Sequence, residues 1–204
     1  RATGDEHILF IEGNWFANDY TGLTPPWDDN MVYSFHKYWS SLDDLDWIIP
    51  LRDQYNVPLW MGESGENSNT WFTDAVILFE ENNIGWAWWT MRKMESINSP
   101  YNIPINQGYK NILDFWKGEG PRPSEDESFN AVMKLADNLL VPNNTFRPDV
   151  IDALMRQPNT EATIPYSDQS IPGAVYMSDY DLGKNGIAYY DVDAANYQLT
   201  TGQW

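Results

Sequence analysis

The sequence predicts an α/β fold that is built on a parallel sheet. Four short apolar runs, each followed by polar residues, have the composition of strands that are buried on both faces. Amphipathic helical patterns alternate with these runs, as in parallel α/β architecture. No Gly-x-Gly-x-x-Gly motif follows any of the runs, so a dinucleotide-binding Rossmann fold is not indicated. The predicted strands cover residues 7–11, 31–35, 58–61 and 84–89.

Three helices are expected in the first 120 residues. Residues 42–49 place Leu and Ile side chains on one face, and Pro50 is expected to kink or interrupt this helix. Residues 71–79 repeat apolar side chains at helical spacing before Asn82-Asn83. Residues 109–116 do the same and end at Gly118. The order of elements is therefore β-loop-β-α-β-α-β-α.

The pattern changes beyond residue 120. Pro121-Arg122-Pro123 breaks the chain, and Ser124 with Glu127 has the spacing of a capping box at the start of a helix. A second, shorter helix is expected to start at Pro148. The predicted organisation is a first domain over residues 1–120, a helical extension over 121–156, a polar linker over 157–170 and a Tyr- and Asp-rich β-prone tail over 171–204.

Composition narrows the class of function. The chain carries 12 Lys and Arg against 30 Asp and Glu, a net charge of −18, so binding to nucleic acid or to an anionic membrane surface is disfavoured and neutral substrates are favoured. It has no Cys, which excludes disulfides and thiolate chemistry. No apolar run is long enough to cross a membrane. The chain begins at Arg1 without a signal-peptide pattern, so any targeting segment is expected to lie upstream or to have been removed.

Glu63 is the strongest candidate for a catalytic residue. It directly follows an apolar strand, where a parallel barrel delivers side chains to its catalytic mouth. The same logic places His36 and Tyr38 at the end of the preceding strand and Trp89 at the end of the next. A carboxylate, an imidazole, a phenol and an indole are what a sugar-cleaving pocket requires, since the carboxylate attacks the anomeric carbon and the indole stacks on the ring. The alternative is that Glu63 is an ordinary loop carboxylate.

Three segments together resemble a known enzyme family. Residues 30–38, 57–63 and 85–89 look like strands six, seven and eight of a glycoside hydrolase family 5 barrel, a family that includes cellulases and mannanases. Residues 7–14 then look like strand five, and the resemblance covers roughly residues 7–117. The ordered trio of short motifs at the right spacing carries this resemblance, because no single motif is long.

The resemblance implies specific roles. Glu63 matches the catalytic nucleophile, His36 and Tyr38 match the His-x-Tyr pair of the substrate-binding cleft, and Trp89 matches the stacking tryptophan of the last strand. It implies a polysaccharide substrate, no cofactor, and an extracellular or cell-surface location. Two histidines in the whole chain, without a ligand-like spacing, also argue against a catalytic metal.

The chain departs from the family in one important respect. A retaining glycosidase needs a second carboxyl group about 5–5.5 Å from the nucleophile. In the family this acid follows an Asn at the end of strand four, but the sequence has no Asn-Glu dipeptide. Only four strands are predicted, whereas a complete (β/α)8 barrel takes about 250 residues. We therefore expect the carboxyl-terminal half of a TIM barrel, strands five to eight, without the acid/base residue.

Other residues are weaker candidates for substrate binding. Asn14 and Trp15 follow the first strand, where a sugar platform and simple loop packing are equally credible. Glu12 is expected to be a loop carboxylate near a distal subsite. Residues 179–193 resemble the opening of a family 6 carbohydrate-binding module, a β-sandwich that needs about a hundred residues.

Three hypotheses for function remain open from the sequence. The first is a piece of a retaining, cellulase-like β-glycanase. The second is a non-catalytic carbohydrate-binding protein, in which Glu63 only accepts hydrogen bonds. The third is an inert half-barrel that pairs with a second copy, or with a separate half-barrel partner, to cover its sheet edges.

Overall fold

The computed structural model describes residues 4–38, 41–42 and 45–190. The chain divides into two compact units, the first formed by Arg1–Trp89 with Ile151–Trp204 and the second by Thr90–Val150. The domain boundary expected at residue 120 falls inside the second unit. The reason is that the two helices on either side of residue 120 pack closely, so that a Cβ atom at Gly108 would lie 2.8 Å from the Cβ of Ala131.

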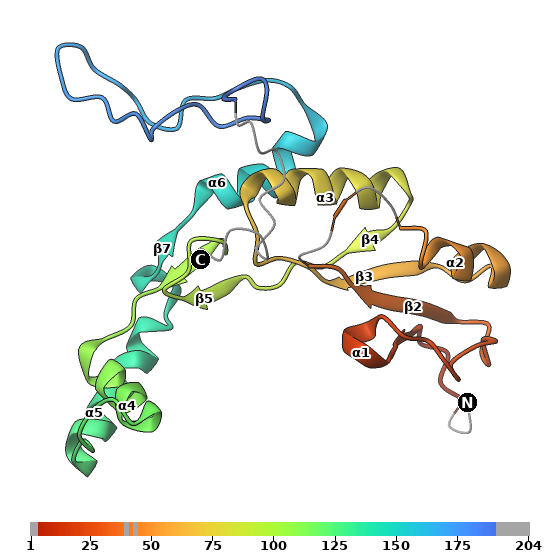
Figure 1. Cartoon of the computed structure of the whole chain (residues 1–204), viewed down its shortest axis with the longest axis horizontal. Helices are drawn as coiled ribbons and strands as arrows, with labels where there is room; N and C mark the ends of the chain where they lie inside the picture. The colour runs from red at the N-terminus through yellow and green to blue at the C-terminus, as the bar shows by residue number, and fades with distance from the viewer. Residues whose placement is uncertain (1–3, 39–40, 43–44, 191–204) are drawn as a thin grey trace. The chain divides into compact units, whose positions relative to one another are not determined.

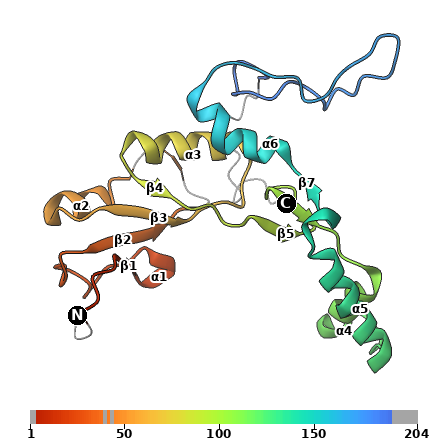
Figure 2. The same ribbon diagram turned by 180° about the vertical axis from the view of Figure 1, so that it is seen from behind.

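The first unit contains a parallel sheet of four strands. These strands are β1 (Leu9–Glu12), β2 (Met31–His36), β3 (Leu59–Glu63) and β4 (Gly85–Trp86), and they lie in sequence order β1-β2-β3-β4 (Figures 1 and 2; β1 is labelled in Figure 2). All three pairings are parallel. The structure confirms the predicted mixed α/β fold with a parallel sheet. Each of the four apolar runs contributes one strand, but the last run forms a strand only at Gly85–Trp86, so Trp89 lies beyond the end of β4.

Two of the connecting helices begin where the sequence has a clear start signal. Helix α3 (Asn69–Glu81) is capped by Ser68, whose hydroxyl accepts a hydrogen bond from the Trp71 amide at 3.2 Å. Helix α2 (Ile49–Tyr55) has Pro50 in its first turn. The helix expected over residues 42–49 was wrong, because residues 46–48 form a turn and the helix begins at Ile49. Proline is well accommodated in the first turn, where its missing N–H has no intrahelical partner.

Helix α3 packs on one face of the sheet, as the two opposite views in Figures 1 and 2 show. Most of its apolar residues are at most 1% exposed, and the ring of Phe79 contacts that of Phe35 in β2 at a centroid distance of 6.1 Å. We call this the covered face; its residues in β2 and β3 are Met31, Tyr33, Phe35, Leu59 and Met61, all at most 5% exposed.

The opposite face of the sheet carries different side chains. The register aligns Phe10 with Val32, Glu12 with Ser34, and Ser34 with Trp60. The rings of Phe10 and Trp60 meet edge to face across the strand between them. We call this the open face; its residues are Phe10, Glu12, Val32, Ser34, Trp60 and Gly62.

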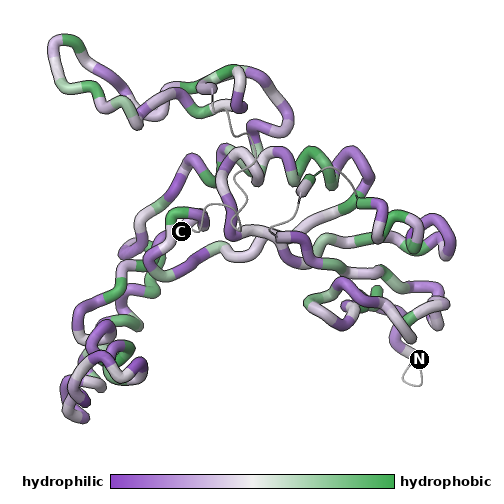
Figure 3. Tube along the Cα trace, viewed as in Figure 1, coloured by the Kyte–Doolittle hydropathy of each residue, from purple (hydrophilic) through white to green (hydrophobic). Residues whose placement is uncertain are grey.

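The second unit holds three short strands and two helices. The strands β5 (Arg92–Met94), β6 (Tyr101–Ile103) and β7 (Thr145–Phe146) form a separate sheet that the sequence analysis did not predict. Helix α4 (Gln107–Lys117) ends at Gly118 in the left-handed conformation, as expected. Helix α5 (Glu125–Asn138) begins with the predicted capping box of Ser124 and Glu127. Hydrophobic and hydrophilic residues alternate along both helices (Figure 3).

The chain after the second unit returns to α3. Helix α6 (Pro148–Ile151) continues into a π-helical turn (Asp152–Arg156) and a 3-10 turn (Gln157–Asn159). The Thr73 hydroxyl of α3 donates to the Ala153 carbonyl oxygen at 2.9 Å, and Gln157 is buried beside it. The linker predicted over residues 157–170 therefore starts with residues that are packed rather than solvated.

The segment after residue 160 is held by a few polar contacts. An antiparallel bridge joins Ile164 to Leu182, and the hydroxyls of Thr70 and Tyr189 are hydrogen-bonded. Within the described residues 171–190, no strand longer than an isolated bridge forms. The β-sandwich module stays a prediction, since Asp191 and Asp193 of its motif lie outside the described residues. No helix in the described part of the chain is both long and apolar enough to cross a membrane.

Candidate active site

Three strand ends bring the candidate residues together at the carboxyl edge of the parallel sheet. Glu12 ends β1, His36 ends β2 and Glu63 ends β3. The pairing of β2 with β3 shifts between Phe35 and His36, so that His36 lies opposite Glu63 instead of Gly62. Such an irregularity re-aims side chains and is common next to active sites. Here it places the imidazole beside the candidate nucleophile.

Glu63 receives two contacts on the same carboxylate oxygen. The Tyr38 hydroxyl donates a hydrogen bond to Oε2 at 2.8 Å. His36 Nδ1 lies 3.6 Å from the same oxygen, at ion-pair distance. The Glu63 side chain is 35% exposed, so the carboxylate is accessible although it is held. Tyr38 and His36 orient Oε2, and no contact to Oε1 occurs among the residues that the structure describes.

His36 is the last residue of β2 and Tyr38 lies two residues further along the chain, and both side chains reach Glu63. Residues two apart in an extended chain point to the same side. Lys37, which lies between them, is buried and donates from Nζ to the Ser41 carbonyl oxygen at 2.7 Å. Its backbone N–H donates to the Glu63 carbonyl oxygen at 3.1 Å, so the chain after β2 is tied to the end of β3.

Tyr38 is a hydrogen-bond donor that stays protonated. Burial is the main cause that raises the pKa of the Tyr38 hydroxyl far above its ordinary value of 10.0, and the hydrogen bond to Glu63 and the charges of Glu63 and Glu66 raise it further. Tyr38 therefore donates to Glu63 over the whole physiological pH range. A neutral donor on one oxygen of a carboxylate orients it without neutralising it.

Glu12 also belongs to the cluster, contrary to its expected place near a distal subsite. Its Oε1 lies 3.3 Å from His36 Nε2 and 3.5 Å from the Ser34 hydroxyl. The register of β1 with β2 pairs Glu12 with Ser34, which brings this carboxylate to the end of β2. The sequence places Glu12 at the end of its strand, as it does Glu63. Only the pairing register shows that Glu12 lies beside His36.

Gly62 makes room for the cluster. A Cβ atom at Gly62 would lie 2.3 Å from the Ser34 hydroxyl oxygen, 3.4 Å from Glu12 Oε1 and 3.6 Å from His36 Nε2. The first distance is far below a van der Waals contact, so any larger residue would displace Ser34. Together with Ser34, Gly62 is a site residue that the sequence analysis missed.

Trp89 is positioned by the residue that follows Glu63. Its backbone N–H donates to the Ser64 carbonyl oxygen at 2.7 Å, while its ring is 48% exposed. Gly65 has a φ of +150°, and a Cβ atom there would lie 1.8 Å from the Trp89 carbonyl oxygen. Only glycine allows this approach. The indole predicted to stack on sugar is thus tied to the loop that follows Glu63, the candidate nucleophile.

Asn14 and Trp15 lie just after β1, in the short helical turn α1 (Asn14–Ala17). Trp15 and Phe16 have left-handed backbone angles, with φ of 51° and 54°, and both rings are exposed. Within residues 4–38, 41–42 and 45–190, no hydrogen bond, ion pair or ring contact joins Asn14 or Trp15 to Glu63. Their role in substrate binding stays a prediction.

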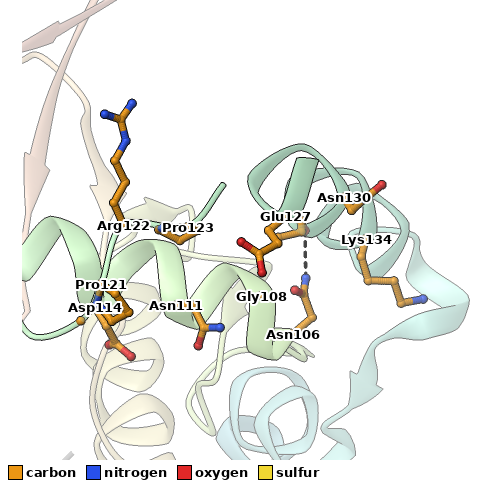
Figure 4. A pocket seen from close by; sticks show the side chains of 12 residues that line it. Asn106, Gly108, Asn111, Asp114, Pro121, Arg122, Pro123, Glu127, Asn130 and Lys134 are labelled. Atoms are coloured by element: carbon orange, nitrogen blue, oxygen red, sulfur yellow. Dashed lines mark hydrogen bonds between the residues drawn. The ribbon is translucent and has the colours of Figure 1, made fainter. Parts of the chain in front are cut away.

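A polar groove of about 660 Å³ lies between α4 and α5 in the second unit. Figure 4 shows Asn106, Asn111 and Asp114 on the α4 side, with Glu127 and Lys134 on α5. The Asn106 amide donates to the Ala131 carbonyl oxygen at 3.0 Å and so joins the two helices. No aromatic side chain lines the groove, in contrast to the surroundings of Glu63. It therefore offers no aromatic ring on which a sugar could stack.

Among the residues described, no group of three or more His, Asp, Glu or Cys side chains is placed to hold a metal ion. The carboxylates of Glu12 and Glu63 instead share the imidazole of His36. The chemistry of this cluster is that of carboxylate, imidazole and phenol groups.

No protein-family profile matches the chain, and no curated protein matches its sequence. An endoglucanase is similar in structure, with a TM-score of 0.36 and 18% identity over 47% of this chain and 42% of that one.

Two further solved structures are similar. The cellulose synthase subunit Z of Clostridioides difficile has a TM-score of 0.44 and 17% identity, over 73% of this chain and 49% of that one. The catalytic domain of an endoglucanase from Thermobifida fusca has a TM-score of 0.36 and 17% identity, over 63% and 46%. The chain spans less than half the length of each of these three proteins. The geometry around Glu63 therefore carries the functional argument.

Proposed function

We propose that this chain is the carboxyl-terminal half of a retaining β-glycoside hydrolase that acts on polysaccharides, with Glu63 as the nucleophile. The observation that carries the proposal is the pair of contacts from Tyr38 and His36 to Oε2 of Glu63 at the end of a parallel strand. Both contacts fall on one oxygen, which leaves Oε1 as the attacking atom. The resemblance of the strand motifs to glycoside hydrolase family 5 supports the same assignment.

The chemical step follows from this geometry. Oε1 of Glu63 forms a bond to the anomeric carbon while the bond from that carbon to the leaving oxygen breaks, and the electron pair departs with the leaving group. Tyr38 and His36 hold Oε2, and the exposed ring of Trp89 offers an apolar surface for the sugar. A natural polysaccharide also requires a proton on the leaving oxygen. We propose that this acid belongs to the half of the barrel that is absent from the chain.

A mechanism-based label tests Glu63 without the missing acid. In 2,4-dinitrophenyl 2-deoxy-2-fluoro-β-cellobioside the leaving group needs no proton, and the fluorine slows breakdown of the glycosyl-enzyme. We expect one fluorocellobiosyl group per chain by intact mass, located on Glu63 by peptide mapping. Glu63→Gln should not be labelled, whereas Glu81→Gln, an exposed change of the same charge on α3, should react as the natural chain does.

The carbohydrate-binding alternative makes the opposite prediction. A non-catalytic binding protein would retain cello-oligosaccharides, measured by calorimetry, yet show no covalent label. Labelling of the natural chain at Glu63 would exclude this alternative, and binding without labelling would replace our proposal with it.

The exposed edge of the sheet supports the half-barrel part of the proposal. In the described structure β1 pairs on one side only, with β2, and Phe10 on the open face is 52% exposed. An unpaired edge with exposed apolar residues is a template for another strand. We propose that an amino-terminal half-barrel, or a second copy of the chain, covers it. Hydrolysis of carboxymethyl-cellulose that appears only after adding a family 5 amino-terminal half would support the first partner, and a dimer mass in light scattering the second.

We also propose an extracellular or cell-surface location, since polysaccharides are too large to enter cells intact. This proposal rests on the substrate class alone. Detection of the full-length protein in the culture medium of its source would support it.

A further inference from the structure

Two carboxylates share one imidazole at the mouth of the sheet. Nε2 of His36 lies 3.3 Å from Oε1 of Glu12, and Nδ1 lies 3.6 Å from Oε2 of Glu63. The His36 side chain is only 11% exposed, so its two ring nitrogens have these carboxylates as their partners rather than bulk water. The three residues come from three neighbouring strands, β1, β2 and β3.

We propose that Glu12 is a positioning residue, which accepts a hydrogen bond from His36 Nε2 and thereby keeps Nδ1 directed at Glu63. An imidazole ring turns freely about its bond to Cβ unless a partner fixes one of its nitrogens. The hydrogen bond at one nitrogen fixes the orientation of the ring and therefore of the other nitrogen. With a proton on each ring nitrogen, Nε2 donates to Glu12 and Nδ1 faces Glu63 as an ion pair. The inference deepens the proposed function, on which it rests, and concerns how the nucleophile is held.

The position of Glu12 is itself determined by the sheet. Its strand partner Ser34 is buried, and the Ser34 hydroxyl lies 3.5 Å from the same Oε1 that faces His36. Gly62 leaves the space in which Ser34, Glu12 and His36 approach each other. Tyr20 fixes the backbone of this region, because its hydroxyl donates to the Ser34 carbonyl oxygen. Because the strand register fixes the position of Glu12 on β1, its carboxylate can orient the ring of His36 on β2.

Glu12 does not take the role of the missing acid in this arrangement. Its Oε1 faces the imidazole of His36 and the hydroxyl of Ser34, not the Glu63 carboxylate. The ring of His36 lies between the two carboxyl groups. A retaining acid/base pair, by contrast, leaves the space between its carboxyl groups free for the glycosidic bond.

The rate of labelling at Glu63 tests the proposal in the whole chain. With the fluorocellobioside probe, we expect Glu12→Ala to lower the limiting first-order rate of inactivation about tenfold, the lower end of the range known for partners of oriented histidines. The concentration at half-maximal rate should not change, because a residue that acts only by positioning His36 leaves binding of the probe unaffected. Glu12→Gln keeps an acceptor oxygen and should recover most of the rate. An equal loss in Glu12→Gln and Glu12→Ala would overturn the proposal.

A double-mutant cycle shows whether Glu12 acts through His36. If it does, Glu12→Ala has no further effect on the labelling rate in a His36→Ala background. Additive losses from the two substitutions would overturn the proposal, since Glu12 would then act by another route. Glu81→Gln is again the charge-matched control.

Nitrogen NMR of the imidazole gives a readout that needs no reaction. The chain has two histidines, and a His7→Gln variant assigns their signals. We expect Nε2 of His36 to carry a proton in the natural chain and in Glu63→Gln, and its signal to change in Glu12→Ala. A bare Nε2 in the natural chain would overturn the proposal. If the natural chain is not labelled at all, the proposed function fails, while this measurement still decides whether Glu12 holds His36.

Discussion

The covered and open faces of the same sheet differ in almost every physical respect. On the covered face, Tyr33, Phe35 and Met61 are completely buried. On the open face, one strand position away, Ser34 and Gly62 adjoin the charged side chain of Glu12. Both faces are made by the same strands, β2 and β3.

The difference shows how a strand serves stability and chemistry at once. Side chains alternate between the two faces of a strand, so each second residue can be chosen for burial and the others for reactivity. Tight packing on the covered face holds the strands rigidly, and a rigid strand holds carboxylate and imidazole groups at defined distances. We therefore expect substitutions on the covered face to reduce stability, and those on the open face to act mainly on the site.

The largest effect on stability is expected from a substitution on the covered face. Phe35→Ala should lower the free energy of unfolding by about 3–5 kcal/mol, because it removes a fully buried ring that contacts Phe79 and Trp47. Phe10→Ala on the open face is the matched control and should cost about 1 kcal/mol, since half of this ring is already exposed. Urea unfolding followed by tryptophan fluorescence measures both. Equal losses would mean that the two faces are buried alike.

Gly62→Ala should give an intermediate loss. The added methyl group would lie 2.3 Å from the Ser34 hydroxyl oxygen, and overpacking of this kind costs about 1–3 kcal/mol. Removing the oxygen should relieve the clash, so the double variant Ser34→Ala/Gly62→Ala should be more stable than Gly62→Ala alone. A single variant as stable as the natural chain would show that the open face adapts freely.

The environment of Tyr38 predicts that the free energy of unfolding depends on pH in alkaline solution. Burial, with the Glu63 hydrogen bond and charge, raises the pKa of Tyr38 in the folded chain above the ordinary 10.0. Above that pH the unfolded chain releases this proton and the folded chain keeps it, so stability falls as the pH rises. Tyr38→Phe should make the unfolding free energy fall less steeply above pH 10.0. The same slope in both chains would contradict the assigned environment of Tyr38.

The smallest effect on stability is expected at Trp89. Its ring is nearly half exposed, so Trp89→Ala should change the unfolding free energy by no more than about 0.5 kcal/mol. Binding of cellotetraose should nevertheless weaken about fivefold, the equivalent of one aromatic contact worth about 1 kcal/mol. Calorimetric titration measures the second effect. Unchanged affinity would remove Trp89 from the proposed substrate-binding residues.

Local patterns in the sequence predicted much of this molecule. The four strands follow from their apolar runs, and the ends of α4 and the start of α5 follow from Gly118 and the Ser124–Glu127 box. The expected neighbourhood of His36, Tyr38 and Glu63 follows from parallel strands that end at one edge, and the contacts of Glu63 agree with it. These features depend on residues close in sequence or on a general rule of parallel sheets.

Other features depend on how distant segments meet. Pairing register, not composition, aligns Glu12 with Ser34, and an irregularity between Phe35 and His36 sets His36 opposite Glu63. The close packing of Gly108 against Ala131 decides that α4 belongs with α5. No local pattern contains this information. Each of these contacts joins two segments that are distant in the sequence, and neither segment by itself indicates its partner.

The sequence by itself thus determined that the chain has a parallel α/β sheet with a carboxylate, an imidazole and a phenol at strand ends, since periodicity and strand termini are local properties. Tertiary structure alone decided which carboxylates the imidazole faces and which oxygen of Glu63 is held. The physical reason is that a hydrogen bond depends on separations of a few tenths of an ångström, and those are set by strand register and packing across the whole sheet.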